Sequence, residues 1–153
     1  MTDNPPFDAN AAHKYFSAHC FNKTWDYIDK PERTSEEDMA MLHSAITSLW
    51  HWTQREDAQP ENLSVGYWQV SRVYALLRQP DNARRYAEVS LKLAEGSEPF
   101  YSGFAFEALA RAEMVAGDRV KMQRFLEKAR EALEQIKEEE DRQVLAKDLE
   151  SIH

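Results

Sequence analysis

The sequence has few of the residues that interrupt helices. Its 153 residues include only 4 glycines and 6 prolines, so few tight turns are expected and a fold of many short strands is disfavoured. No segment alternates polar and apolar side chains convincingly at a period of two. The residues that are plentiful, Ala, Leu, Glu, Lys, Arg and Gln, lose little on entering a helix. The composition therefore predicts an all-α protein.

Cysteine, long apolar runs and excess basic charge are also scarce. The single cysteine, Cys20, cannot form an internal disulfide, which is typical of a reducing compartment. No apolar run approaches the roughly 18–20 residues that span a bilayer, and the first ten residues have no basic or apolar stretch of a secretory signal. The net charge is −8, whereas proteins that bind a phosphate backbone usually carry excess Lys and Arg. We expect a cytoplasmic protein that binds neither membranes nor nucleic acids.

What is present is a series of helical patterns divided by proline and glycine. Residues 1–7 are predicted to be a flexible N-terminal arm, and residues 8–153 a single domain of about seven helices. The links between the helices are short, which favours antiparallel hairpins. The predicted hairpins cover about residues 8–57, 60–95 and 99–137, and a capping helix follows over about 139–151.

Local signals place the first two helices. Asp8 or Asn10 could cap the first, and Ser35 with Asp38 has capping-box spacing at the start of the second, with Asp in place of Glu or Gln. Each helix carries a row of large side chains recurring at three and four residues. The rows are Tyr15, Phe16, His19, Cys20, Lys23 and Tyr27 in the first helix, and Met39, Leu42, Ile46, Leu49, Trp50 and Thr53 in the second.

The second half contains a repeated pattern of large and small residues. Small residues let two helices cross closely while larger ones fill the spaces between them. The pattern aligns the third and fourth predicted helices with the fifth and sixth. In the first pair it reads Tyr67, Val70, Ser71, Tyr74, Ala83, Ala87 and Ser90. In the second pair it reads Phe106, Leu109, Ala110, Glu113, Gly117, Met122, Leu126 and Ala129.

Over about residues 63–133 this pattern resembles the tetratricopeptide repeat. It departs from the family at Glu113, where an aromatic is usual, at Met122, where Ala is usual, and in its spacing, because the link over residues 95–99 is long. The resemblance implies a right-handed α-solenoid of stacked hairpins that binds a protein or peptide on a concave surface of the first, third and fifth helices.

The whole chain is also similar to a group of uncharacterised small bacterial helical proteins, which implies no activity. The stretches that carry this likeness are residues 13–16, 20–22, 24–26 and 71–75, with Trp68.

The first half concentrates the residues that could form a site. It holds all four tryptophans, the cysteine and four of the five histidines. Trp50, His51 and Trp52 cannot share one face, because successive helical residues are about 100° apart. Two interpretations are open: the second helix is the buried centre of the N-terminal part, or one Trp and a His line a groove.

Metal binding and nucleophilic catalysis have weaker signals. His13 and Cys20 lie two helical turns apart, roughly 10 Å along the axis, and no pair has the spacing of metal ligands. No metal or cofactor is therefore predicted, although His13, His43 and a carboxylate such as Asp26 could meet through the fold. Cys20 is interpreted as a buried structural thiol rather than a nucleophile.

Arg72 lies in an apolar helix near Tyr67, Trp68 and Tyr74. It would suit a partner's carboxylate on an aromatic surface, or it forms an internal ion pair with Asp26, Asp29 or Glu107.

These patterns favour a non-catalytic module that binds a protein or peptide partner. The alternative is a small-molecule sensor or helical enzyme with a pocket lined by His, Trp and Arg in the N-terminal half. A homodimer whose exposed aromatics form the interface is a third hypothesis. The candidate binding residues are His13, Cys20, Asp26, His43, Trp50, Trp68 and Arg72.

Overall fold

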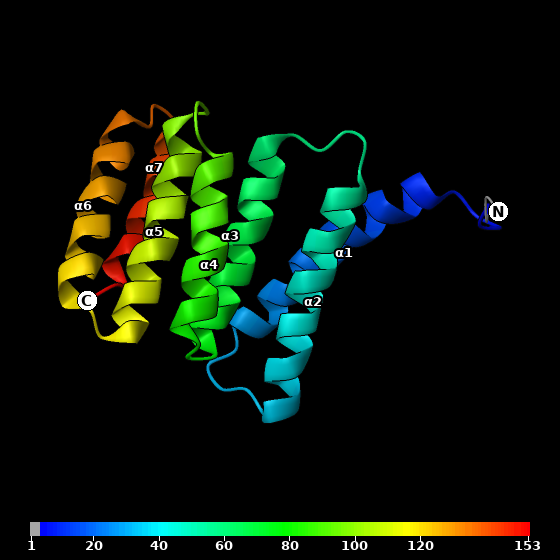
Figure 1. Ribbon diagram of the computed structural model, residues 1–153, viewed down its shortest axis with the longest axis horizontal. Coiled ribbons are helices and arrows are strands. Elements are labelled where there is room, and N and C mark those ends of the chain that lie inside the picture. The colour runs from blue at the N-terminus through cyan, green and yellow to red at the C-terminus, as the bar shows by residue number, and fades with distance from the viewer. Residues whose placement is uncertain (1–3) are drawn as a thin grey trace. The chain divides into compact units, whose positions relative to one another are not determined.

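The computed structural model describes residues 4–153, and the regular structure of these residues is entirely helical (Figure 1). The predicted all-α class is therefore confirmed, as is the expected number of seven helices within the described part of the chain. The helices are α1 (Ala9–Ile28), α2 (Ser35–Gln54), α3 (Pro60–Leu76), α4 (Pro80–Leu93), α5 (Pro99–Ala116), α6 (Arg119–Gln135) and α7 (Glu139–Glu150).

The helices group into two compact units, Met1–Gln59 and Pro60–His153. The first unit contains α1 and α2, and the second contains α3 to α7. The flexible arm over residues 1–7, of which residues 1–3 lie outside the described residues, and the single domain over 8–153 stay predictions.

A capping box begins α2, one residue earlier than predicted. Thr34 has an extended backbone, and its hydroxyl accepts a hydrogen bond from the Glu37 amide at 3.2 Å, while the Glu37 carboxylate accepts one from the Thr34 amide at 3.0 Å. The predicted pairing of Ser35 with Asp38 is wrong. The longer side chain of glutamate can reach back to the cap, whereas Asp38 instead accepts a hydrogen bond from Arg33 at 2.7 Å.

Small and polar side chains are buried in the first unit. Ser17 and Thr24 are the buried residues of α1, and Ser48 of α2 donates a hydrogen bond to the Ser17 carbonyl at 2.7 Å. Short side chains let α1 and α2 approach closely. The rows of large residues correctly indicated helices, but several of their members, including Tyr15 and Trp50, are exposed.

The second unit is built around α5. This helix packs against α3, α4, α6 and α7, and an almost unbroken run over residues 103–113 is buried. A helix that is buried on nearly every side is expected at the centre of a bundle. Consecutive helices from α3 to α7 run in opposite directions (Figure 1). Gly117 ends α5 with a left-handed φ of 79°, and the side chain of Asp118 caps α6.

Gly103 of α5 is a site of close helix packing. A Cβ atom there would lie 2.7 Å from Leu145 Cδ2 and 3.4 Å from Ala132 Cβ. Leu145 is fully buried, so it can yield only by disturbing the contact of α7 with α5. We expect Gly103→Ala to lower the free energy of unfolding by about 1 kcal/mol, because overpacking of about 1–3 kcal/mol exceeds the helix-propensity gain of about 1 kcal/mol.

Chemical denaturation followed by circular dichroism measures this effect. Ser102→Ala, one residue earlier on a half-buried position, is the control. Stabilisation by Gly103→Ala, the usual result at an exposed helical glycine, would show that α7 is not held at this contact.

Candidate functional site

Six ring-bearing side chains of the first unit form a continuous group, which we term the aromatic–histidine cluster. It consists of His13, Tyr15, Phe16 and His19 from α1 and Trp50 and His51 from α2.

Ring contacts connect the cluster within and between the two helices. Tyr15 stacks on His19, one turn further along α1, with ring centroids 5.2 Å apart. Phe16 stacks on His51 of α2 at 5.4 Å, and His13 meets the edge of Trp50 at 5.5 Å. These separations lie within the range of favourable ring pairs. The rings therefore hold one another in place.

The large aromatic side chains of the cluster are open to solvent. Tyr15 is 60% exposed, Trp50 is 53% exposed and Phe16 is 41% exposed. Single exposed apolar residues are common, but contiguous exposed aromatics mark interaction surfaces. Trp50 therefore lies outside the core, although Met41, Ala45, Ser48 and Leu49 of the same helix are buried.

A hydrogen bond between two histidines connects α1 to α2 within the cluster. The Nδ1 atoms of His13 and His51 are 2.8 Å apart, so one ring donates and the other accepts. Burial, and then the charge of His13, lower the pKa of His51 below its ordinary value.

Arg55 fixes the end of α2 beside the cluster. Its guanidinium lies 3.9 Å from the ring centre of Trp52 and donates to the Ser17 hydroxyl of α1 at 3.0 Å. It also pairs with Asp57 at 2.8 Å, and this hydrogen bond is the main reason that the pKa of Asp57 is lowered to about 2. Arg55 therefore connects α1 and the end of α2 to the segment that follows α2.

The predicted site residues of the first unit do not all meet. His13 and Trp50 are in contact, but Asp26 and His43 are exposed outside the cluster, and Cys20 is a half-buried thiol whose pKa is raised by burial. Among residues 4–153, no group of three His, Cys, Asp or Glu side chains could hold a metal ion. The alternative site of His13, His43 and Asp26 is therefore wrong as a metal centre.

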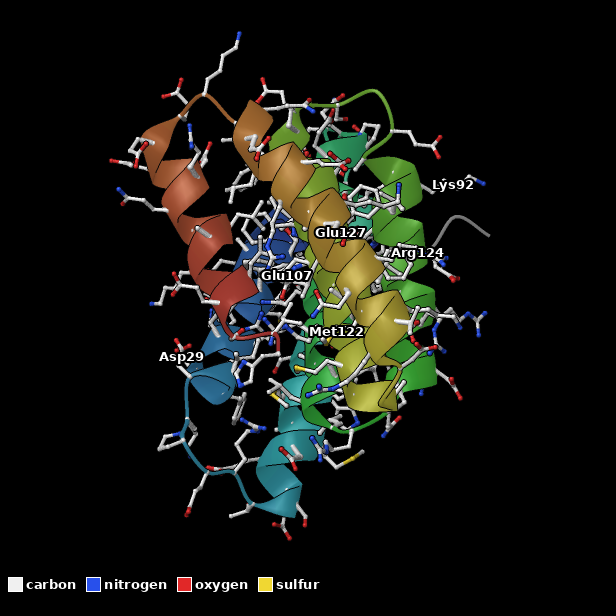
Figure 2. All side chains as sticks on the ribbon, turned by 90° about the vertical axis from the view of Figure 1, so that its left-hand side faces the viewer. Asp29, Lys92, Glu107, Met122, Arg124 and Glu127 are labelled. Atoms are coloured by element: carbon white, nitrogen blue, oxygen red, sulfur yellow. The ribbon has the colours of Figure 1, made fainter. Side chains whose placement is uncertain are left out.

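Trp68 and Arg72 belong to the second unit, where both bind a buried glutamate. Trp68 Nε1 donates to Glu107 Oε2 at 2.8 Å, and Arg72 Nη1 donates to Glu107 Oε1 at 3.2 Å. Arg111 Nε donates to the same Oε1 atom at 2.7 Å. Glu107 is completely buried in the interior of the second unit, whereas Glu127 of α6 is exposed (Figure 2). Of the internal partners considered for Arg72, Glu107 is therefore bound.

The same network attaches α7. Arg111 Nη2 donates to the Asp148 carbonyl at 3.1 Å and to the Ser151 hydroxyl at 2.7 Å. The Asp148 carboxylate lies 3.7 Å from Arg72, and burial, with Glu107 as the next cause, raises its pKa. The group thus connects α3, α5 and α7, and its geometry is that of a structural anchor.

Sequence reasoning did not identify Tyr15, Phe16, His19 and His51 as site residues, although all but His51 stand in a helical row. It also gave no role to Arg111. The available signal was the presence of Glu107 and Arg111, one helical turn apart, in a helix whose one other charged residue is Glu113.

Comparison with known proteins found no match to models of protein families, to curated proteins or to solved structures. Within residues 4–153, no helix has the length and apolar character needed to cross a membrane.

Proposed function

We propose that this protein is a non-catalytic protein-interaction module and that the aromatic–histidine cluster is its contact surface. The observation that carries this proposal is the exposure of Tyr15, Phe16 and Trp50 in one group of packed rings. Aromatic side chains dominate the binding energy of many protein interfaces. Rings that are already packed on one another lose less conformational freedom on binding.

The charges of α1 indicate the chemistry of the partner. Between Asp8 and Asp26 the chain carries two lysines and two histidines and no carboxylate, although its net charge is −8. Lys14 and Lys23 are exposed, and they pair at the borders of this stretch with Asp57 at 3.9 Å and with Asp26 at 3.6 Å. We propose a partner segment that has carboxylates beside apolar side chains. We favour such a partner over a second copy of the chain, because a two-fold dimer would place α1 against a second α1 that has no carboxylate between Asp8 and Asp26.

We favour this function over a pocketed enzyme or sensor. Ligand pockets enclose most of a small molecule, whereas Trp50 is more than half exposed. Arg72, which the alternative would use in a pocket, is bound by Glu107. The cytoplasm is the proposed location, because a lone thiol such as Cys20 stays reduced there.

We further propose that α3 to α6 stack as tetratricopeptide-like hairpins with a right-handed solenoid arrangement. Support comes from Ala83, Ala110 and Ala129, which are fully buried where the resemblance requires small residues. Ser71 also donates a hydrogen bond to the Ala83 carbonyl at 2.7 Å. In this proposal the stacked hairpins belong to the second unit, and the contact surface belongs to the first unit.

Removing two exposed rings tests the proposed contact surface. In the double variant Phe16→Ser/Trp50→Ser we expect partner affinity to fall by at least about 30-fold, corresponding to about 2 kcal/mol, because hot-spot aromatics are lost. Immobilised wild-type and variant chains would be compared for proteins retained from a lysate of the source organism, and affinities then measured with a purified retained protein.

The matched control is Val120→Ser/Val144→Ser, which removes two exposed apolar side chains from the second unit. Partners retained equally by the ring variant and by wild type would contradict the proposal. Sedimentation of the wild type tests whether a second copy of the chain occupies this surface instead. A dimer that dissociates in Phe16→Ser/Trp50→Ser would identify the second copy as the partner.

A further inference from the structure

The His13–His51 pair has the geometry of two rings that share one proton. The ring centroids are 5.1 Å apart and the Nδ1 atoms 2.8 Å apart, so the Nδ1 atoms lie close to the line between the ring centres. Two rings on one metal ion would instead point at it from different directions, as in a tetrahedral site. The arrangement therefore fits an N–H···N hydrogen bond.

We propose that His13 and His51 form a proton-operated latch that holds the aromatic–histidine cluster together and opens when both rings are protonated. This inference rests on the proposed function, because the surface that the latch controls is the proposed contact surface. His13 touches Trp50, and His51 touches Phe16. Separation of the two histidines would therefore displace exposed rings on both helices.

The number of bound protons determines whether the hydrogen bond exists. In the neutral pair, Nδ1–H of one ring donates to the bare Nδ1 of the other. One added proton can bind Nε2 of the donor ring and leave this bond intact. A second proton must bind the accepting Nδ1, which places two N–H groups and two positive charges face to face. The doubly protonated pair therefore separates.

The charged groups near the pair do not compensate a second positive charge. Lys14 and His19 lie on α1, Arg55 lies at the end of α2, and Glu56 and Asp57 follow it. Asp57 is 3.9 Å from Lys14 and 2.8 Å from Arg55, so this carboxylate already has two cationic neighbours. Glu56 is exposed.

The direction of the pH dependence follows from the lowered pKa of His51. A group whose pKa is lower in the folded state contributes stability above its ordinary pKa, about 6.5 for histidine. This contribution is lost as the pH falls through the lowered value. The latch is therefore closed at neutral pH and opens in acid.

Amide hydrogen exchange of the full chain tests the latch without a partner. Between pH 7.5 and pH 5.0, after correction for the intrinsic exchange rate, the amides of residues 13–17 and 50–54 are expected to exchange about 10-fold faster in acid. The acceleration is expected because protonation of both rings breaks the Nδ1–Nδ1 hydrogen bond and favours local opening of the two helices. In His51→Gln the same ratio is expected to stay within about 2-fold, since the amide replaces the second titrating ring.

His43→Gln, which removes an exposed histidine of α2 outside the cluster, is expected to keep the wild-type ratio. His13→Gln examines the other half of the pair, so the test remains decisive if His51→Gln fails to fold. Equal acid acceleration in wild type and in either pair variant, or no acceleration in wild type, would overturn the latch. Because no partner is present, this result is independent of the outcome of the Phe16→Ser/Trp50→Ser experiment.

Discussion

Replacement of Glu107 by alanine is expected to lower the free energy of unfolding of the second unit by about 3–5 kcal/mol. The variant leaves the positive charges of Arg72 and Arg111 without the carboxylate that both contact, and it removes the acceptor of Trp68 Nε1. Because Glu107 is completely buried, water cannot replace it without opening the bundle. Chemical denaturation at pH 7, followed by circular dichroism, measures the loss.

Glu107→Gln removes the charge of this side chain and keeps nearly the same shape. The amide oxygen can still accept a hydrogen bond from Trp68, but the negative charge is lost, so an intermediate loss of about 1.5–3 kcal/mol is expected. Glu127→Ala on the exposed side of α6 is the control, with a change within about 0.5 kcal/mol. If Glu107→Ala destabilised the chain no more than Glu127→Ala, the network would not be the anchor of α7.

The second large effect is expected at Arg84. Its Nε atom donates to Glu113 Oε1 at 2.6 Å, and its Nη2 atom donates to Glu113 Oε2 at 3.1 Å. Glu113 is 1% exposed, so Arg84→Met would leave a buried carboxylate without this bidentate partner. We expect a loss of about 2–3 kcal/mol, less than for Glu107 because water reaches the partly exposed arginine.

The neighbouring Arg85 provides the control. Arg85 is exposed, and Arg85→Met is expected to change the free energy of unfolding by no more than about 0.5 kcal/mol. Arg84→Lys retains the charge but loses the planar fork, so its loss should lie between the two methionine variants. Equal unfolding midpoints for Arg84→Met and Arg85→Met would show that the pair contributes nothing to stability.

This pair also explains a departure noted in the sequence. Glu113 stands where the tetratricopeptide resemblance expects an aromatic residue. A carboxylate can be buried at this position because Arg84 of α4 reaches Glu113 on α5. The departure was visible from the sequence, but its partner 29 residues away was not, because pairing across helices depends on how they pack.

The helices themselves were predictable because their signals are local. Proline or glycine marks almost every break, and the Gly-Asp pair at residues 117–118 ends one helix and caps the next. At Thr34 the local prediction failed by one residue, since Ser35 and Thr34 both have the chemistry of a cap. The choice depended on the reach of Glu37 compared with Asp38.

The packed faces were less predictable. Rows of large side chains in α1 and α2 correctly indicated helices, but Ser17, Thr24 and Ser48 are buried while Tyr15 and Trp50 are exposed. Burial depends on which neighbour covers a face, and short hydroxyl-bearing side chains permit closer approach than aromatic ones. A periodic row identifies a helix without identifying its buried side.

The sequence by itself determined the all-helical class and the approximate position of each helix, because propensity, caps and breaks act within a few residues. Only the tertiary structure decided that His13 bonds His51, 38 residues away, and that Trp68 bonds Glu107, 39 residues away. Such contacts form only when the packing of the helices turns the two side chains toward each other, which local sequence signals do not specify. The exposed rings of the aromatic–histidine cluster and the buried carboxylate of Glu107 are both consequences of that packing.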